Sequence, residues 1–138
     1  MTRKFFLILL TLAFSTITFS YSQDTGTRQK LIGSWIYAGL QFKSSMTESD
    51  KVESEKADKK NKDLIITFES NGNYIVWNKQ SGKNNPFAKG AVSLTNKGRH
   101  LKIEGLEGDI DKLNEELLML SHPNRPLMVF KKYMPENK

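Results

Sequence analysis

Cysteine is absent from this chain of 138 residues. Its absence excludes disulfide bonds, a thiolate nucleophile, cysteine metal ligands and a lipid anchor attached to a cysteine. Without covalent cross-links, the stability of the fold must come from a packed apolar core.

Histidine is scarce, because His100 and His122 are the only two. Metal sites group histidine, cysteine and carboxylate side chains at fixed spacings, and Glu107, Asp109 and Asp111 lack the spacing of a calcium loop. The sequence has no glycine-rich loop between a strand and a helix that could hold a phosphate. We therefore predict no metal, no cofactor and no enzymatic activity. An active site assembled from distant strands is the alternative.

The chain is weakly basic. It has 21 Lys and Arg residues against 15 Asp and Glu residues, which gives a net charge of +6. Basic residues are spread along the sequence, and acidic residues alternate with them where charge is densest. A nucleic-acid-binding surface clusters its basic residues and places aromatic residues between them. The sequence therefore predicts no nucleic-acid partner.

One long apolar run is present, over residues 5–14, and it is short for a membrane span. Arg3 and Lys4 precede it, and small residues in the pattern Ser20-x-Ser22 follow. This three-part layout is typical of a secretory signal peptide. We predict a signal peptide over residues 1–22, cleaved after Ser22, and one secreted or periplasmic domain over residues 23–138 without stable membrane insertion. An uncleaved membrane anchor is the alternative.

The rest of the chain is rich in strand signals. Apolar and β-branched segments alternate with turn sequences such as Asn71-Gly72, a strong hairpin signal. Even spacing and short turns predict an all-β, eight-stranded, antiparallel up-and-down β-barrel, with an OB-like barrel or a small sandwich as the alternatives. The expected strands cover about residues 31–42, 64–69, 74–79, 87–95, 101–104, 110–113, 117–120 and 127–133.

The first expected strand contains Gly33-x-Trp35-x-Tyr37, and these residues share one face of the strand. Gly-x-Trp at this place resembles the opening motif of the lipocalins and the wider calycin group. The chain resembles more closely the short secreted lipocalin-like domain proteins of Bacteroidetes-type bacteria. The family's leucine pattern before the last strand is matched by Leu113, Leu118 and Leu120.

This resemblance covers roughly residues 28–133. It implies a lipocalin-like barrel with a short helical turn at residues 29–32 that plugs one end. It also implies that a cation from the last strand covers Trp35. Either Lys131 or Lys132 would have to supply this cation, since no arginine follows Phe130.

Residues 43–63 are almost wholly polar and charged. The apolar residues of this segment are Met46, Val52 and Ala57, and three are too few to form the buried apolar stripe of a helix. We predict that this segment is a long, mobile, charged loop. It can be simply solvated, with a short helix that frays. The resemblance implies instead a lid over the open end of the barrel.

Aromatic and aliphatic side chains on one face of the expected strands are the candidate lining of the barrel's lumen. They can line a small apolar pocket, or they can simply pack the core. The assignment assumes uninterrupted alternation, which one bulge would invert. The candidates are Trp35, Tyr37, Leu64, Ile66, Phe68, Tyr74, Val76, Leu118 and Leu120.

These features predict an exported barrel that binds a small apolar or amphipathic molecule. The alternative is a filled barrel that acts as a protein-binding or inhibitor module in the envelope or outside the cell.

Overall fold

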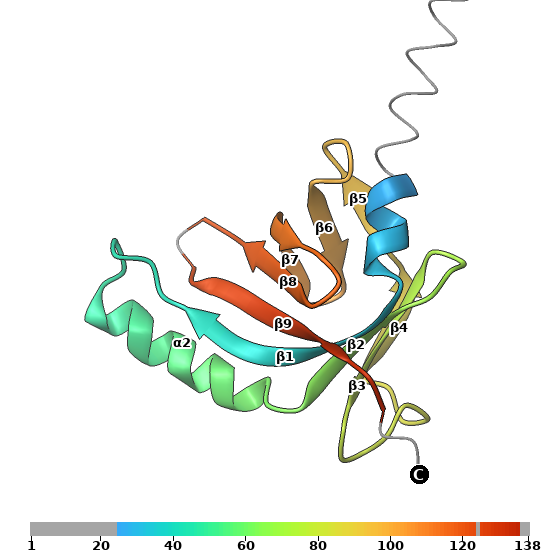
Figure 1. Ribbon diagram of the computed structural model, residues 1–138. Coiled ribbons are helices and arrows are strands. Elements are labelled where there is room, and N and C mark those ends of the chain that lie inside the picture. The colour runs from blue at the N-terminus through green and yellow to red at the C-terminus, as the bar shows by residue number, and fades with distance from the viewer. Residues whose placement is uncertain (1–24, 124, 136–138) are drawn as a thin grey trace, which may run out of the picture.

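The computed structural model describes residues 25–123 and 125–135 (Figure 1). The predicted signal peptide, residues 1–22, lies outside the described residues. Within the described residues, nine antiparallel strands form a nearly closed barrel, which is accompanied by two short helices. One helix covers residues 25–31, and the other is α2, Glu48–Lys60. No helix in the described ranges is long and apolar enough to cross a membrane.

The strands form one sheet of order β4-β3-β2-β1-β9-β8-β7-β6-β5, with antiparallel pairing throughout. Neighbours in the sheet follow one another in the sequence, except where β1 meets β9. The predicted all-β, up-and-down barrel is therefore confirmed. The strands are β1 Gly33–Gln41, β2 Leu64–Phe68, β3 Asn73–Asn78, β4 Ala88–Ala91, β5 Ser93–Thr95, β6 His100–Ile103, β7 Leu106–Leu113, β8 Leu117–Ser121 and β9 Leu127–Tyr133.

The predicted count of eight strands is wrong, because the segment expected as one strand over residues 87–95 is two. Its first half, β4, pairs with β3, and its second half, β5, pairs with β6. Val92 lies between them, and its N–H donates to Gly72 O over 2.9 Å. The chain thus changes partner within one segment, so β4 and β5 are the two ends of the sheet. The Tyr74 hydroxyl accepts a hydrogen bond from Glu104 N at 2.9 Å, which ties β3 to the turn after β6.

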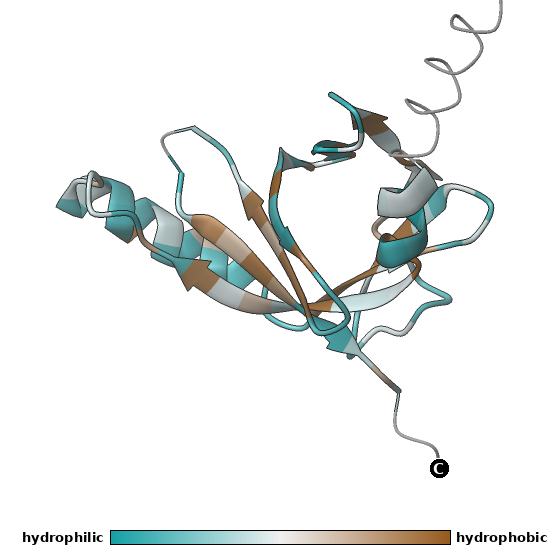
Figure 2. Ribbon diagram, turned by 45° about the horizontal axis from the view of Figure 1, so that its top comes forward, coloured by the Kyte–Doolittle hydropathy of each residue, from teal (hydrophilic) through white to brown (hydrophobic). Residues whose placement is uncertain are grey.

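The core lies inside the barrel, where the apolar residues of alternating strand positions meet. Trp35, Leu118 and Phe130 are fully buried there, and the Tyr37 ring packs edge-on against Phe130 with centroids 5.7 Å apart. Figure 2 shows hydrophobic strands beside a largely hydrophilic α2. The interior is therefore filled with side chains over much of its length.

One end of the barrel is closed by the helix over residues 25–31, as the resemblance implies for residues 29–32 (Figure 1). Leu31 is 2% exposed, and its carbonyl oxygen accepts a hydrogen bond from the Trp35 indole N–H at 2.8 Å. We call this the plugged end. It is closed by apolar burial around Trp35.

The cation expected over Trp35 is Lys132. Its Nζ lies 4.6 Å from the ring centroid and donates to Ile32 O at 2.8 Å. A Cβ on Gly33 would collide with that Nζ, so the glycine leaves the space that the lysine fills. Burial lowers the pKa of Lys132.

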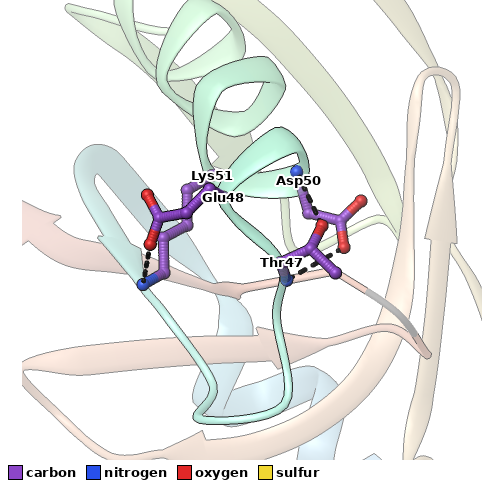
Figure 3. Close-up of polar contacts among 4 residues, drawn as sticks. All are labelled: Thr47, Glu48, Asp50 and Lys51. Atoms are coloured by element: carbon purple, nitrogen blue, oxygen red, sulfur yellow. Dashed lines mark hydrogen bonds and ion pairs between the residues drawn. The ribbon is translucent and has the colours of Figure 1, made fainter.

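The segment predicted as a loop over residues 43–63 instead holds the 13-residue helix α2. Its N-terminus is capped by a reciprocal pair, shown in Figure 3. The Thr47 hydroxyl accepts from Asp50 N at 3.2 Å, and the Asp50 carboxylate accepts from Thr47 N at 3.3 Å. Acidic residues in the first turn and basic residues in the last turn add favourable interactions with the helix dipole.

No residue of α2 is buried. The lack of an apolar stripe therefore predicted its exposure correctly, whereas the segment expected as a solvated loop with fraying helix holds a capped helix of 13 residues. A capped helix of good helix formers can form without burying a face. The mobility of residues 43–63 remains a prediction.

Candidate functional site

An opening of about 420 Å³ lies at the end of the barrel opposite the plugged end, which we call the mouth. Sites for small molecules commonly have roughly 300–1,000 Å³. The strands contribute an apolar floor, and α2 with two turns contributes polar walls. The lining residues are Leu40, Asp50, Glu53, Ser54, Ala57, Asn61, Gly105, Leu106, Glu107, Leu120, Ser121, His122, Arg125, Pro126 and Met128.

The floor depends on a bulge in β1. Tyr37 pairs with Phe130 of β9, but the next pair along the strands is Gly39 with Val129, so Ala38 is the extra residue. The bulge brings Leu40 opposite Met128, which also pairs with Leu120 of β8. These apolar side chains therefore share the inner face at the mouth.

The wall formed by α2 is acidic. Asp50, Glu53, Ser54 and Ala57 recur at spacings of three and four residues, which places them on one face of the helix. Among the described residues that line the opening, none is a lysine of α2. A ligand in the opening would thus meet carboxylates on this side.

The opposite wall carries Glu107, His122 and Arg125. Glu107 is held by His100, whose Nε2 lies 2.8 Å from a Glu107 oxygen while its Nδ1 lies 2.8 Å from an Asp109 oxygen. Hydrogen bonds to Asp109 and then to Glu107 raise the pKa of His100, and the hydrogen bond from His100 lowers the pKa of Glu107. Glu107 therefore adds a negative charge to the rim, and Arg125 a positive one.

One hydrogen bond joins the core to α2. The Tyr37 hydroxyl donates to Asp58 Oδ1 at 2.6 Å. Tyr37 is 8% exposed, and burial, followed by the hydrogen bond to Asp58, raises the pKa of its hydroxyl. The hydroxyl thus remains protonated and able to donate at neutral pH.

The candidate lining residues named from the sequence do come together on the inner face, as the alternation predicted. Trp35, Tyr37, Ile66, Phe68, Tyr74, Val76, Leu118 and Leu120 are buried in one core cluster, and Leu64 packs against it partly buried. Of these, Leu120 lines the opening. The others fill the barrel below it.

Sequence reasoning named no other residue of the floor and no residue of the α2 wall, although the resemblance implied that this segment lies over the open end of the barrel. A signal for Leu40 existed in Gly39, whose φ of +132° suits a bulge. A signal for α2 existed in the spacing of Thr47 and Asp50, which is that of a capping box. Within the described ranges, no group of three or more His, Asp or Glu side chains could hold a metal ion.

Comparisons with protein-family profiles, with curated proteins and with solved structures gave no match to this chain.

Proposed function

We propose that this protein is an exported, lipocalin-like barrel that binds a small amphipathic molecule at its mouth, beneath α2. The observation that carries the proposal is the opening of about 420 Å³, with an apolar floor of Leu40, Leu106, Leu120 and Met128. Burying an apolar ligand against such a floor contributes about 25 cal/mol per Å². The polar part of the ligand would lie against Asp50 and Glu53 of α2.

The lipocalin-like part of the proposal is supported by the plugged end, where Lys132 covers Trp35 beside Gly33. Export is supported by the sequence pattern of residues 1–22, which predicts a secreted or periplasmic location. An intact mass that begins at Gln23 in the exported protein would support cleavage after Ser22, and a retained leader would contradict it.

The filled interior favours a second candidate, a protein-binding or inhibitor module. Trp35, Leu118 and Phe130 have no exposed surface, so the deep lumen offers little room to a ligand. In that case the surface of α2 would contact a protein partner, and the opening at the mouth would stay free of small molecules.

A neutral fluorescent amphiphile, N-phenyl-1-naphthylamine, tests the first candidate against the second. We expect micromolar binding by the wild-type protein. Met128→Gln, which makes the floor polar at similar volume, should weaken binding about fivefold, because roughly 1 kcal/mol of apolar burial is lost. Native mass spectrometry of the exported protein would reveal a molecule that co-purifies.

Val129→Thr is the matched control, since Val129 is the next residue of β9 and faces away from the opening. It should leave binding unchanged. No binding by the wild-type protein, or equal weakening by both variants, would contradict the proposal.

A further inference from the structure

α2 lies along the mouth without being held there by apolar burial. None of its residues is buried, and its largest apolar side chain, Val52, is 53% exposed. Burial of apolar surface is the main force that fixes one element on another. Something else must therefore position this helix.

The ends of the segment are fixed by polar contacts. After α2, Asn78 donates to Lys62 O at 3.3 Å, and Lys79 N donates to Asp63 O at 2.9 Å. Before it, the Lys43 ammonium donates to His122 O at 3.3 Å. These contacts leave the body of the helix between two anchored ends.

The body of the helix is tied to the barrel by Asp58. The hydrogen bond from Tyr37 is short, at 2.6 Å, and its donor sits on the buried inner face of β1. The other side-chain hydrogen bonds of α2, those of Asp50, Lys51 and Ser54, stay within residues 47–54. A hydrogen bond to a charged group from a buried donor is stronger than one made in water.

We propose that the Tyr37–Asp58 hydrogen bond is a latch, which holds α2 over the mouth and sets the rate at which a small molecule enters and leaves. The inference rests on the proposed function for its ligand. Neither Tyr37 nor Asp58 is among the residues that line the opening. Removing the latch therefore changes how often the mouth is open and leaves the ligand's own contacts in place.

A gate of this kind has a kinetic signature. If ligand passes only through the open state, a larger open fraction raises the association and dissociation rate constants by the same factor, and Kd stays nearly constant. Loss of one hydrogen bond to a charged group shifts such an equilibrium by about tenfold.

The first test needs no ligand. The chain has no cysteine, so Met128→Cys places a single thiol on the floor of the opening. We expect Asp58→Ala and Tyr37→Phe to speed its modification by Ellman's reagent about tenfold each. The double variant should be no faster than either single variant, because both remove one interaction.

Glu55→Ala is the matched control, because it removes a carboxylate of α2 that is exposed and does not line the opening. It should leave the rate of thiol modification unchanged. Equal rates in the wild-type and latch variants would overturn the proposal, and so would acceleration by Glu55→Ala to the same extent.

The second test uses stopped-flow mixing of N-phenyl-1-naphthylamine with the same variants without the added cysteine. We expect both rate constants to rise about tenfold in Asp58→Ala, with Kd changed by less than about twofold. A changed Kd at constant association rate would mean that Asp58 acts as a binding contact and would overturn the latch. If the wild-type protein does not bind the probe, the proposed function fails, while the thiol experiment still decides on the latch.

Discussion

The two ends of the barrel are closed in opposite ways. At the plugged end, Leu31 and Trp35 are buried, and Lys132 completes the packing. At the mouth, α2 buries no residue and one hydrogen bond from Tyr37 joins it to the core. Extensive apolar burial makes a stable closure, whereas a single hydrogen bond to a helix that buries no residue can break and reform. From this comparison we expect the mouth, and not the plugged end, to open.

The largest expected effect concerns the plugged end. Trp35→Ala should lower the free energy of unfolding by ~3–5 kcal/mol, the usual cost of removing a large buried aromatic side chain. Val52→Ala, in the exposed α2, should change it by less than about 0.5 kcal/mol. Urea denaturation measures both. A loss below about 1 kcal/mol for Trp35→Ala would contradict the account of this end.

Alanine substitutions at two glycines, with smaller expected effects, separate the cost of backbone strain from the contribution of the contact between Lys132 and Trp35. Gly33 and Gly39 both have strongly positive φ, +123° and +132°, but a Cβ would meet Lys132 at Gly33 and nothing within 4 Å at Gly39. Alanine at either position should cost ~1–3 kcal/mol through strain. Gly33→Ala should cost about 1 kcal/mol more, because Lys132 must leave the Trp35 ring. Equal losses in urea denaturation would show that the lysine contributes nothing.

The mouth should be the first place where the chain is cut by a protease. Limited trypsin digestion should cleave α2 first, after Lys51, Lys56 or Lys59, because unfolding this helix gives up no buried side chain of its own. Mass spectrometry of the first fragments identifies the site. First cuts between Lys79 and Lys102 would mean that the strands there are less stable than α2 and would reverse the comparison.

The smallest expected effect concerns His100, which does not line the mouth itself but contacts Glu107 on its rim. Protonated histidine can donate to both Asp109 and Glu107, whereas the neutral ring can donate to one of them. These contacts raise the pKa of His100 above its ordinary value of 6.5. The stabilisation is therefore complete below about pH 6.5 and is lost as the pH rises through the folded-state pKa.

His100→Gln tests the direction of this pH dependence of stability. It should lower the free energy of unfolding by less than about 1 kcal/mol at pH 5.5, since the contacts are exposed, and should have almost no effect at pH 9. Lys102 and His122 also act on Glu107, so the variant is compared with wild type at each pH. A loss that grows as the pH rises would have the wrong sign.

The sequence predicted the parts of this molecule that depend on alternation and burial. Trp35, Tyr37 and Phe130 face inward because residues two apart share a face of a strand, and their size demands burial. The split at Val92 was not predictable in this way, because partner choice within residues 88–95 depends on strands that are distant in the sequence.

The candidate site was predicted less well than the fold, for a related reason. Its floor depends on a bulge at Ala38, which moves Leu40 onto the inner face against the simple alternation. Its wall depends on α2, which forms through caps and propensity without an apolar stripe. The candidates chosen from the sequence were the large apolar residues of the strands. In this barrel those residues pack the interior, and of them only Leu120 lines the opening.

Replacing α2 by a short linker tests most directly the central claim that α2 covers a ligand-binding mouth and contributes little to the core of the barrel. Residues 44–60 are replaced by a Gly/Ser linker of about eight residues, which can span the ~20 Å length of the helix. Urea denaturation and titration with N-phenyl-1-naphthylamine are then measured on the same protein. The account predicts a loss of unfolding free energy of no more than about 1.5–3 kcal/mol, the contribution of the lost Tyr37–Asp58 hydrogen bond, together with at least about tenfold weaker binding of the probe. Collapse of stability, or unchanged binding without α2, would contradict it.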